Sequence, residues 1–416
     1  MEVVPRKRRP YSTLEKLEMK KTLVAIAALS AVSAFAQSTI ELTGTMDAGY
    51  QMITAKGSAY ALVGSNGSAT TALIFKANED LGGGLSAQFQ YEIDPGLTET
   101  SSKTVGTPAT GTTSNVTSSA GNGQSFVGLT SASVGQIRFG TPNLQTLAAS
   151  GDGNGGFNTA IGSGYRVTSF DAVRFQNSLR YDTPNMSGFQ VSYVMTPKNS
   201  VQTNALTAGL TGNLQNQTMG RDGANELGLV YAQGPLTARL ATLNMSQGAS
   251  VALSADPLNG ITWSARPTGG AFKLNTMSLK YAVNNKLTAN YFYQKAASDA
   301  LFANNAGTVS TVAQFDRTTN GFSASYLASP TINLLANYAK VKNGDKAVSA
   351  AAASHAGMTA SVLGLGADYI FSKRTIAYFR YEIDNDSAAG FRTVTGYGVA
   401  GDFKYTATGV GIRHTF

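Results

Sequence analysis

The strict alternation of apolar and polar residues is the feature that most constrains the fold of this chain. Between Leu85 and Asp94 every second residue is apolar, and the residues between them are Ser, Gln, Gln, Glu and Asp. Successive strand residues point to opposite faces, so this pattern predicts a strand with one apolar face and one polar face in contact with water. The same alternation recurs in 175–181, 277–283, 287–293 and 410–416. Such strands suit either a soluble sandwich or a barrel whose outer face meets lipid.

The connections between the expected strands are of two kinds, short turns and long polar loops. The short turns are at 80–84, 133–135, 184–188, 233–235, 284–285, 329–330 and 372–373, and the loops rich in Ser, Thr, Asn, Gly and Ala are at 95–123, 197–224, 247–271, 297–314 and 342–358. Outer-membrane barrels have short turns on one side and long loops on the other, whereas a sandwich has no reason for this asymmetry. A spacing of roughly one hairpin per 45–50 residues predicts about 16 strands.

Residues 19–36 have the organisation of a secretory signal peptide. Lys20 and Lys21 supply a positive start, residues 23–35 form an apolar run, and the segment ends in small-x-small at Ala36. The run is too short to span a bilayer with ease. A buried core helix is the alternative, but it does not explain why charge, apolar run and cleavage site follow in this order. We expect cleavage after Ala36.

The segment before Met19 has no place in such a signal. Its PRKRRP sequence alone would fit a basic nucleic-acid tail, but we expect instead that translation starts at Met19 and that residues 1–18 do not belong to the mature protein. Residues 1–36 hold seven of the 32 Lys/Arg and three of the 24 Asp/Glu, which leaves 25 against 21 and a net charge of +4. Because much of the basicity is removed, we predict no nucleic-acid partner.

The expected mature chain has no cysteine and no run of eighteen apolar residues. Neither disulfides nor a membrane-spanning helix can therefore hold it in place. In hydrocarbon every backbone N–H and C=O needs an internal partner, so a membrane-spanning sheet has to close on itself. The sequence thus predicts an all-β protein, a transmembrane antiparallel β-barrel of about 16 strands over 37–416 in the cell outer membrane.

Four segments carry a family resemblance. They are Phe75–Leu85, Phe126–Leu129, Asn177–Pro184 and Gly409–Phe416. Occurring in this order, they resemble the general trimeric porins of Gram-negative bacteria, most closely the β-proteobacterial type, over nearly all of 37–416. The resemblance implies a homotrimer surrounded by outer-membrane lipid and lipopolysaccharide, through which small hydrophilic solutes and ions diffuse passively. The terminal Phe416 resembles the assembly signal that the barrel-assembly machinery reads in the last strand.

In that family the third loop folds into the barrel and narrows it. The matching segment here is 142–172, between expected strands at 136–141 and 173–182. It is rich in glycine and mildly acidic through Asp152 and Asp171, so it can pack against a basic wall.

Alternation supplies candidates for that wall. If Ile137, Phe139, Phe175, Leu179 and Tyr181 face lipid, the charged residues of the same strands face the lumen. A charge on the lipid face near midplane costs about 2–4 kcal/mol, which makes the inward orientation the favoured one. The residues placed inward in this way are Arg138, Arg174, Arg180, Lys76 and Arg413. Together with Asp152 and Asp171 they are the predicted pore-lining, constriction residues.

The sequence also departs from the family pattern. Ala72, Gly123 and Thr141 stand where the family often has arginine. The same parity places further acids in the lumen, namely Asp47, Glu92, Asp94, Asp368, Glu382 and Asp384. We therefore expect only a weak preference for anions.

Catalytic and metal-binding motifs find little support. Gly151–Gly156 contains GxGxxG without the surrounding strand and helix of a dinucleotide site. Asp152 and Asn154 resemble a calcium loop that lacks its later Glu. With only two histidines, a Ser-His triad is disfavoured. We predict no cofactor, no metal and no enzyme activity. The alternatives are a substrate-specific channel and a barrel enzyme of the phospholipase or protease type.

Overall fold

The computed structural model covers most of the expected barrel. It describes residues 38–55, 58–95, 103–106, 113–116, 123–157, 160–163, 174–175, 177–197, 223–246, 252–256, 261–265, 271–298, 302–304, 312–314, 316–344, 346–347, 359–386 and 403–416. The expected upstream segment and signal peptide (1–36) lie outside these residues, as does Asp171. Within the described ranges, no helix is long and apolar enough to cross a membrane.

Seventeen strands form one antiparallel sheet. They are β1 (Thr39–Ala55), β2 (Ser58–Ser65), β3 (Ala72–Gly82), β4 (Leu85–Ile93), β7 (Ser125–Ser131), β8 (Gly135–Thr141), β9 (Ser178–Asp182), β10 (Phe189–Thr196), β11 (Ala224–Gln233), β12 (Leu236–Ser246), β15 (Ala271–Ala282), β16 (Leu287–Ser298), β19 (Asp316–Ser329), β20 (Ile332–Asn343), β22 (Thr359–Ile370), β23 (Thr375–Asp386) and β24 (Phe403–Thr415). β3 pairs with the first half of β1 and β2 with its second half, so β2 and β3 share one position. The sheet therefore has 16 positions, as predicted.

The sheet closes because its first and last strands pair. The register of β1 and β24 runs from Thr45 opposite Thr415 to Ala55 opposite Tyr405. The backbones of Gly44 and Phe416 then exchange two further hydrogen bonds, each of 3.1 Å. Closure gives the backbone groups of both end strands partners, which is what a hydrocarbon environment demands.

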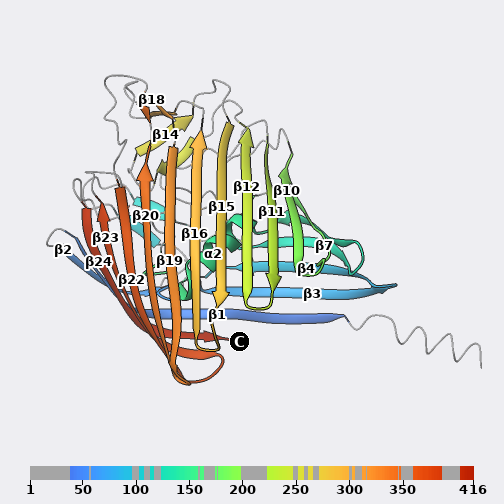
Figure 1. Ribbon diagram of the computed structural model, residues 1–416, viewed down its shortest axis with the longest axis horizontal. Coiled ribbons are helices and arrows are strands. Elements are labelled where there is room, and N and C mark those ends of the chain that lie inside the picture. Colours follow the sequence, from blue (N-terminus) through green and yellow to red (C-terminus); the bar gives the residue numbers. More distant parts are fainter. Residues whose placement is uncertain are drawn as a thin grey trace, which may run out of the picture.

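The predicted turns join consecutive strands of this sheet. For example, the β3–β4 turn has positive φ at Gly82, Gly83 and Gly84, a conformation that glycine adopts without strain. At the other end lie the predicted long loops. Their described parts include a pair of short strands, β5 (Lys103–Gly106) and β6 (Thr113–Val116). They also include a small five-stranded sheet, whose β14 and β18 are labelled near the top of Figure 1. Its strands are β13 (Ala252–Asp256), β14 (Ile261–Ala265), β17 (Phe302–Asn304), β18 (Val312–Gln314) and β21 (Lys346–Ala347).

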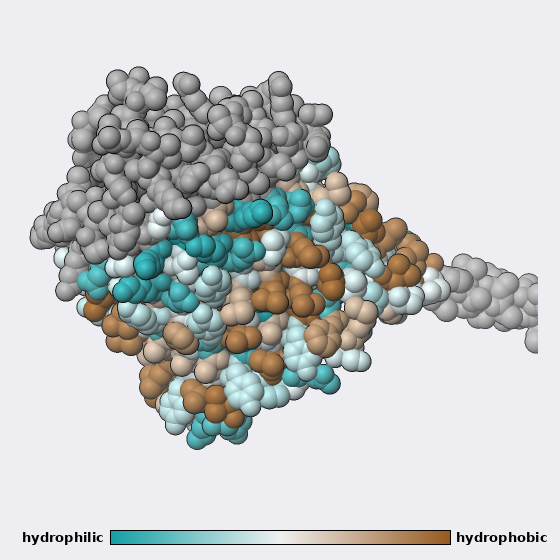
Figure 2. All heavy atoms as spheres, turned by 45° about the horizontal axis from the view of Figure 1, so that its top comes forward, coloured by the Kyte–Doolittle hydropathy of each residue, from teal (hydrophilic) through white to brown (hydrophobic). Residues whose placement is uncertain are grey.

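The alternation predicted from the sequence is confirmed on the wall of the barrel. Phe89, Val127, Phe139 and Ile412 are between 47% and 58% exposed, as expected of side chains that face lipid. Many such apolar groups are visible on the surface in Figure 2. Residues of the opposite parity point inward, where polar and charged side chains are buried in large number.

The third loop enters the barrel, as predicted. After β8 the chain forms α2 (Gln145–Gly153) and a short 3-10 turn, η1 (Gly155–Phe157). Figure 1 shows α2 within the ring of strands, and it contacts β11, β12, β15, β16 and β19. The helix was not predicted, because a segment rich in glycine carries little helical signal in isolation.

One expected strand begins later than predicted. β9 starts at Ser178 rather than at 173, since Asn177 adopts a positive φ of 51° that an extended strand cannot continue through. Phe175 is accordingly buried, with 1% of its surface exposed, and does not face lipid. Arg174 precedes the strand, and its backbone forms an isolated bridge with Asn143. Its inward orientation therefore comes from the returning loop and not from strand parity.

Deletion of Phe416 should reduce the amount of folded barrel. The deletion removes two backbone hydrogen bonds to Gly44, each contributing about 1 kcal/mol, and the aromatic ring that packs against Gly44. Heat-modifiable barrel in outer-membrane fractions measures the effect, with Phe416→Tyr as the control that keeps an aromatic end. Equal barrel levels for the deletion and the wild type would contradict the prediction.

Candidate functional site: the lumen around the third loop

The start of α2 is fixed to the barrel wall by one carboxylate. Glu226 on β11 is fully buried and accepts hydrogen bonds from the backbone N–H of Gln145 (2.5 Å) and of Thr146 (3.0 Å). The hydroxyl of Thr146 donates a third bond of 2.6 Å. The first N–H groups of a helix have no partner within the helix and carry partial positive charge, so a carboxylate here stabilises the helix end.

The middle of the loop is held by charge. Asp152 at the end of α2 accepts a hydrogen bond of 2.5 Å from Arg239 Nε on β12, and Lys280 Nζ on β15 lies 3.9 Å away. Ser323 on β19 donates to the carbonyl of Gly153 at 2.8 Å. The basic wall that Asp152 meets is thus made by Arg239 and Lys280, and not by the arginines predicted from the sequence.

The tip of the loop reaches the far side of the barrel. The N–H of Gly162 donates to Glu382 on β23 at 2.5 Å. Asn337 on β20 donates to the carbonyl oxygen of Gly162 at 3.0 Å. A Cβ on Gly364 would lie 2.0 Å from the carbonyl oxygen of Gly162, so only glycine allows this approach. The loop therefore covers the inner wall from β11 to β23.

The opposite wall, made by β1, β3, β4, β7 and β8, borders a polar cavity of about 320 Å³. Its lining includes Glu41, Lys76, Gln90, Gln136 and Arg138. Lys76 and Arg138, both predicted as pore-lining, face this cavity.

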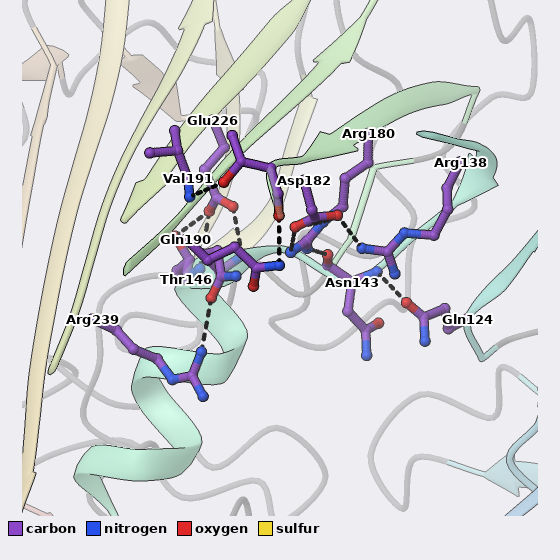
Figure 3. A network of polar contacts seen from close by, with 12 residues as sticks. Gln124, Arg138, Asn143, Thr146, Arg180, Asp182, Gln190, Val191, Glu226 and Arg239 are labelled. Atoms are coloured by element: carbon purple, nitrogen blue, oxygen red, sulfur yellow. Dashed lines mark hydrogen bonds and ion pairs between the residues drawn. The ribbon is translucent and has the colours of Figure 1, made fainter. Parts of the chain in front are cut away.

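Two of the predicted arginines share one acidic partner. Asp182 at the end of β9 forms ion pairs with Arg138 Nη2 (2.5 Å) and with Arg180 Nη2 (2.6 Å). Figure 3 shows the guanidinium groups of Arg138 and Arg180 both beside the carboxylate of Asp182. Arg180 also donates to the carbonyl of Asn143 at the start of the third loop. The group thus carries one net positive charge rather than two.

Arg174 lies where the third loop returns to the wall. Its side chain is 7% exposed and its Nη2 is 4.0 Å from Asp94, just past the end of β4. Burial raises the pKa of Asp94 to about 6, with a further increase from the nearby charge of Glu92. Among the residues that the structure describes, Arg174 Nε and Nη1 have no hydrogen-bond partner.

The remaining predicted residues divide between the lumen and the undescribed part of the chain. Arg413 on β24 points inward and donates to Ser68 Oγ at 3.1 Å. Asp171 lies outside the described residues, so its contacts are not part of the structure. Within the described ranges, no group of three or more His, Cys, Asp or Glu residues could hold a metal ion.

The sequence reasoning missed several charged residues of the lumen. Asp182, Glu226, Arg239 and Arg380 all lie on strands and face inward. Their parity relative to apolar neighbours was readable, since Leu227, Leu229, Leu240 and Phe379 face outward. Apart from Arg180, which lies two residues before Asp182 on β9, the partners could not be read, because they lie on other strands or on the third loop.

A family model described as Gram-negative porin matches residues 22–389. The chain belongs to this family. Outer membrane porin protein 32 of Delftia acidovorans is 31% identical over 189 residues, which is 42% of this chain and 49% of that relative. The match spans about half of the relative's length.

Solved porin structures share the fold. The anion-selective porin from Comamonas acidovorans superposes with a TM-score of 0.64 at 19% identity, covering 91% of this chain and all of that one. A trimer form of OmpT from Vibrio cholerae superposes with a TM-score of 0.58 at 14% identity, covering 91% and 99%. The chain is therefore a porin barrel of the Gram-negative outer membrane, and family and fold point to a channel rather than an enzyme.

Asp182→Asn should raise the preference of this porin for anions. The substitution removes the one negative charge that Arg138 and Arg180 share, so both guanidinium charges act on the lumen. The reversal potential in a salt gradient at 0.1 M measures the change, since the screening length there is about 10 Å. Asp316→Asn, which breaks an ion pair with Lys295 on another part of the wall, is the matched control. An Asp182 variant with the wild-type reversal potential would count against this electrostatic role.

Lowering the pH from 7 to 5 should also shift selectivity toward anions. The pKa of Asp94 is raised to about 6, so this carboxylate, 4.0 Å from the Arg174 guanidinium, loses its charge in that interval. Carboxylates of ordinary pKa, near 4, stay ionised there. Reversal potentials recorded across this pH range should show a step with its midpoint near pH 6. Asp94→Asn should remove the step, and a step of undiminished size in that variant would contradict the assignment to Asp94.

Proposed function

We propose that this porin is an open pore for the passive diffusion of small hydrophilic solutes and ions. The observation that carries the proposal is that the third loop covers only one part of the inner wall and leaves another part beside a polar cavity. The third loop covers the wall from β11 to β23, whereas β1, β3, β4, β7 and β8 border a polar cavity. Water and hydrated solutes can pass along a polar wall, and a rigid loop on the other side limits their size.

The pore is proposed to prefer anions weakly. Support comes from Lys76 and Arg413 on the inner wall and from the net positive charge of the Arg138, Arg180 and Asp182 group. One solved relative is described as anion-selective. Ala72, Gly123 and Thr141 provide no positive charge where the family often has one, and Asp94 opposes Arg174. These opposing contributions favour a small preference.

The assembly is proposed to be a homotrimer inserted by the barrel-assembly machinery, with lipid and lipopolysaccharide as its surroundings. The trimer form of OmpT supports this stoichiometry by fold analogy. The terminal strand with Phe416 supports the assembly route, because it forms the seam with β1. We also propose that the chain has no catalytic activity, since family and fold indicate a channel.

Conductance of purified trimers in a planar bilayer tests the function. An open trimeric pore should give three nearly equal conductance steps for each insertion. A folded, inserted protein that carries no current would overturn the proposal and favour a plugged barrel or a barrel enzyme.

Replacing Arg138, Arg174 and Arg180 together by Ser should shift the reversal potential toward cations. Asp182 and Asp94 then lose their cationic partners, and the narrower side chains should raise conductance slightly. The shift should shrink at 1 M salt, where the screening length is about 3 Å. Arg374→Ser, in the exposed β22–β23 turn, is the control. If the triple variant and the wild type have equal reversal potentials at low salt, these arginines do not act on the permeating ions.

A further inference from the structure

A second segment besides the third loop enters the lumen. It is Asn66–Thr71, the interruption between β2 and β3, which share one strand position against β1. Asp47 on β1 faces inward beside this interruption, because the neighbouring Tyr50 and Met52 of opposite parity are exposed. Ser68, Thr71 and Asp47 are at most 1% exposed, so the segment packs against the inner wall. We call it the inner turn.

One carboxylate holds the backbone of the inner turn. The N–H groups of Gly67, Ser68 and Ala69 donate to Asp47 at 3.0, 2.8 and 2.8 Å. The hydroxyl of Thr71 donates to the carbonyl of Asp47 and accepts from its N–H, both at 3.1 Å. Bonds from several N–H groups to one charged acceptor are stronger than neutral ones and fix the turn in one orientation. An amide in place of this carboxylate has a single acceptor oxygen and cannot receive all of them.

The same carboxylate also joins the two sides of the barrel seam. Tyr378 on β23 donates its hydroxyl proton to Asp47 at 2.8 Å, and β24 lies between these two strands. The ring can cross the inner face of β24 because Gly411 has no side chain: a Cβ there would lie 2.4 Å from the hydroxyl oxygen of Tyr378.

The inner turn is connected to the third loop through one arginine. Arg380 on β23 is fully buried, donates to Ser68 Oγ at 3.1 Å and forms an ion pair of 2.7 Å with Asp368. Its guanidinium lies 5.7 Å from the centre of the Phe157 ring in the third loop. The two inward segments thus touch the same side chain, and together they line the wall from β11 to β1.

We propose that the inner turn is a second constriction element and that Asp47 is its positioning residue. The inference rests on the proposed pore function. It adds that two inserted segments, the third loop and the inner turn, narrow the waist of the pore. The Asp47 charge is enclosed by donors, whereas Asn66 and Thr70 are exposed. The turn therefore presents neutral polar groups to the pore, and its contribution is to limit solute size.

Single-cysteine labelling tests whether the inner turn lines the path of the permeating ions. The chain has no cysteine, so Thr70→Cys introduces one thiol at an exposed position. Reaction with a trimethylammonium methanethiosulfonate should cause a stepwise loss of conductance in reconstituted trimers. Ser133→Cys, in the exposed β7–β8 turn, is the matched control and should conduct equally before and after labelling. Complete labelling of Thr70→Cys, shown by mass spectrometry, with unchanged conductance would overturn the inference.

Unit conductance tests the role of Asp47. Asp47→Asn should raise the unit conductance and the size of neutral sugars that enter liposomes, because the released turn no longer narrows the waist. Tyr378→Phe, which removes one of the four donors to this carboxylate, should give a smaller increase. A purely structural role would lower the yield of folded trimer without changing the conductance of the trimers that form. If folded Asp47→Asn trimers have the conductance and the sugar size limit of the wild type, the inference is wrong but the pore function stands. If wild-type trimers carry no current, the proposed pore function is wrong as well.

Discussion

Backbone hydrogen bonding in hydrocarbon is the constraint on which the rest of this barrel depends. Each unpaired N–H or C=O in the membrane costs several kcal/mol, about as much as a whole side chain gains by burial. The pairing of β1 with β24 removes the two free edges that an open sheet would have. Once the sheet is closed, parity separates a lipid face from a lumen face, and the buried charged side chains of the strands lie on the lumen face.

Inside the barrel, carboxylates do most of the positioning. Glu226 holds the start of α2, Glu382 holds the tip of the third loop, and Asp47 holds the inner turn. In each case the acceptor lies on a strand and the donors are backbone N–H groups of an inserted segment. The backbone N–H groups of such segments have no acceptor in the β-sheet, so a carboxylate on the barrel wall accepts their hydrogen bonds instead. These three carboxylates are therefore enclosed by donors and have no exposed surface.

The arginines follow the same logic. Arg138 and Arg180 share Asp182, Arg239 pairs with Asp152, and Arg380 pairs with Asp368. A buried charge without a partner is costly, so pairing is the expected outcome in a crowded waist. Ion selectivity then depends on small local imbalances, such as two guanidinium groups around one carboxylate, rather than on the net charge of +4 expected for the mature chain.

The sequence by itself determined the alternating strands, their turns and the asymmetry of the loops. Except around Phe175, before β9, it also determined the face to which strand side chains point. A period of two and the cost of charge in lipid are local, one-dimensional constraints, so they can be read from the chain alone. The sequence also located the inserted loop, through family resemblance. Only the tertiary structure decided which charges meet. Asp182 pairs with both Arg138 and Arg180 because Arg138 lies opposite Arg180 in the register of β8 and β9. Asp47 meets Tyr378 because closure brings the two ends of the chain together. Partners separated by hundreds of residues carry no mark in the alternation of either segment, so their pairing appears only when the barrel closes.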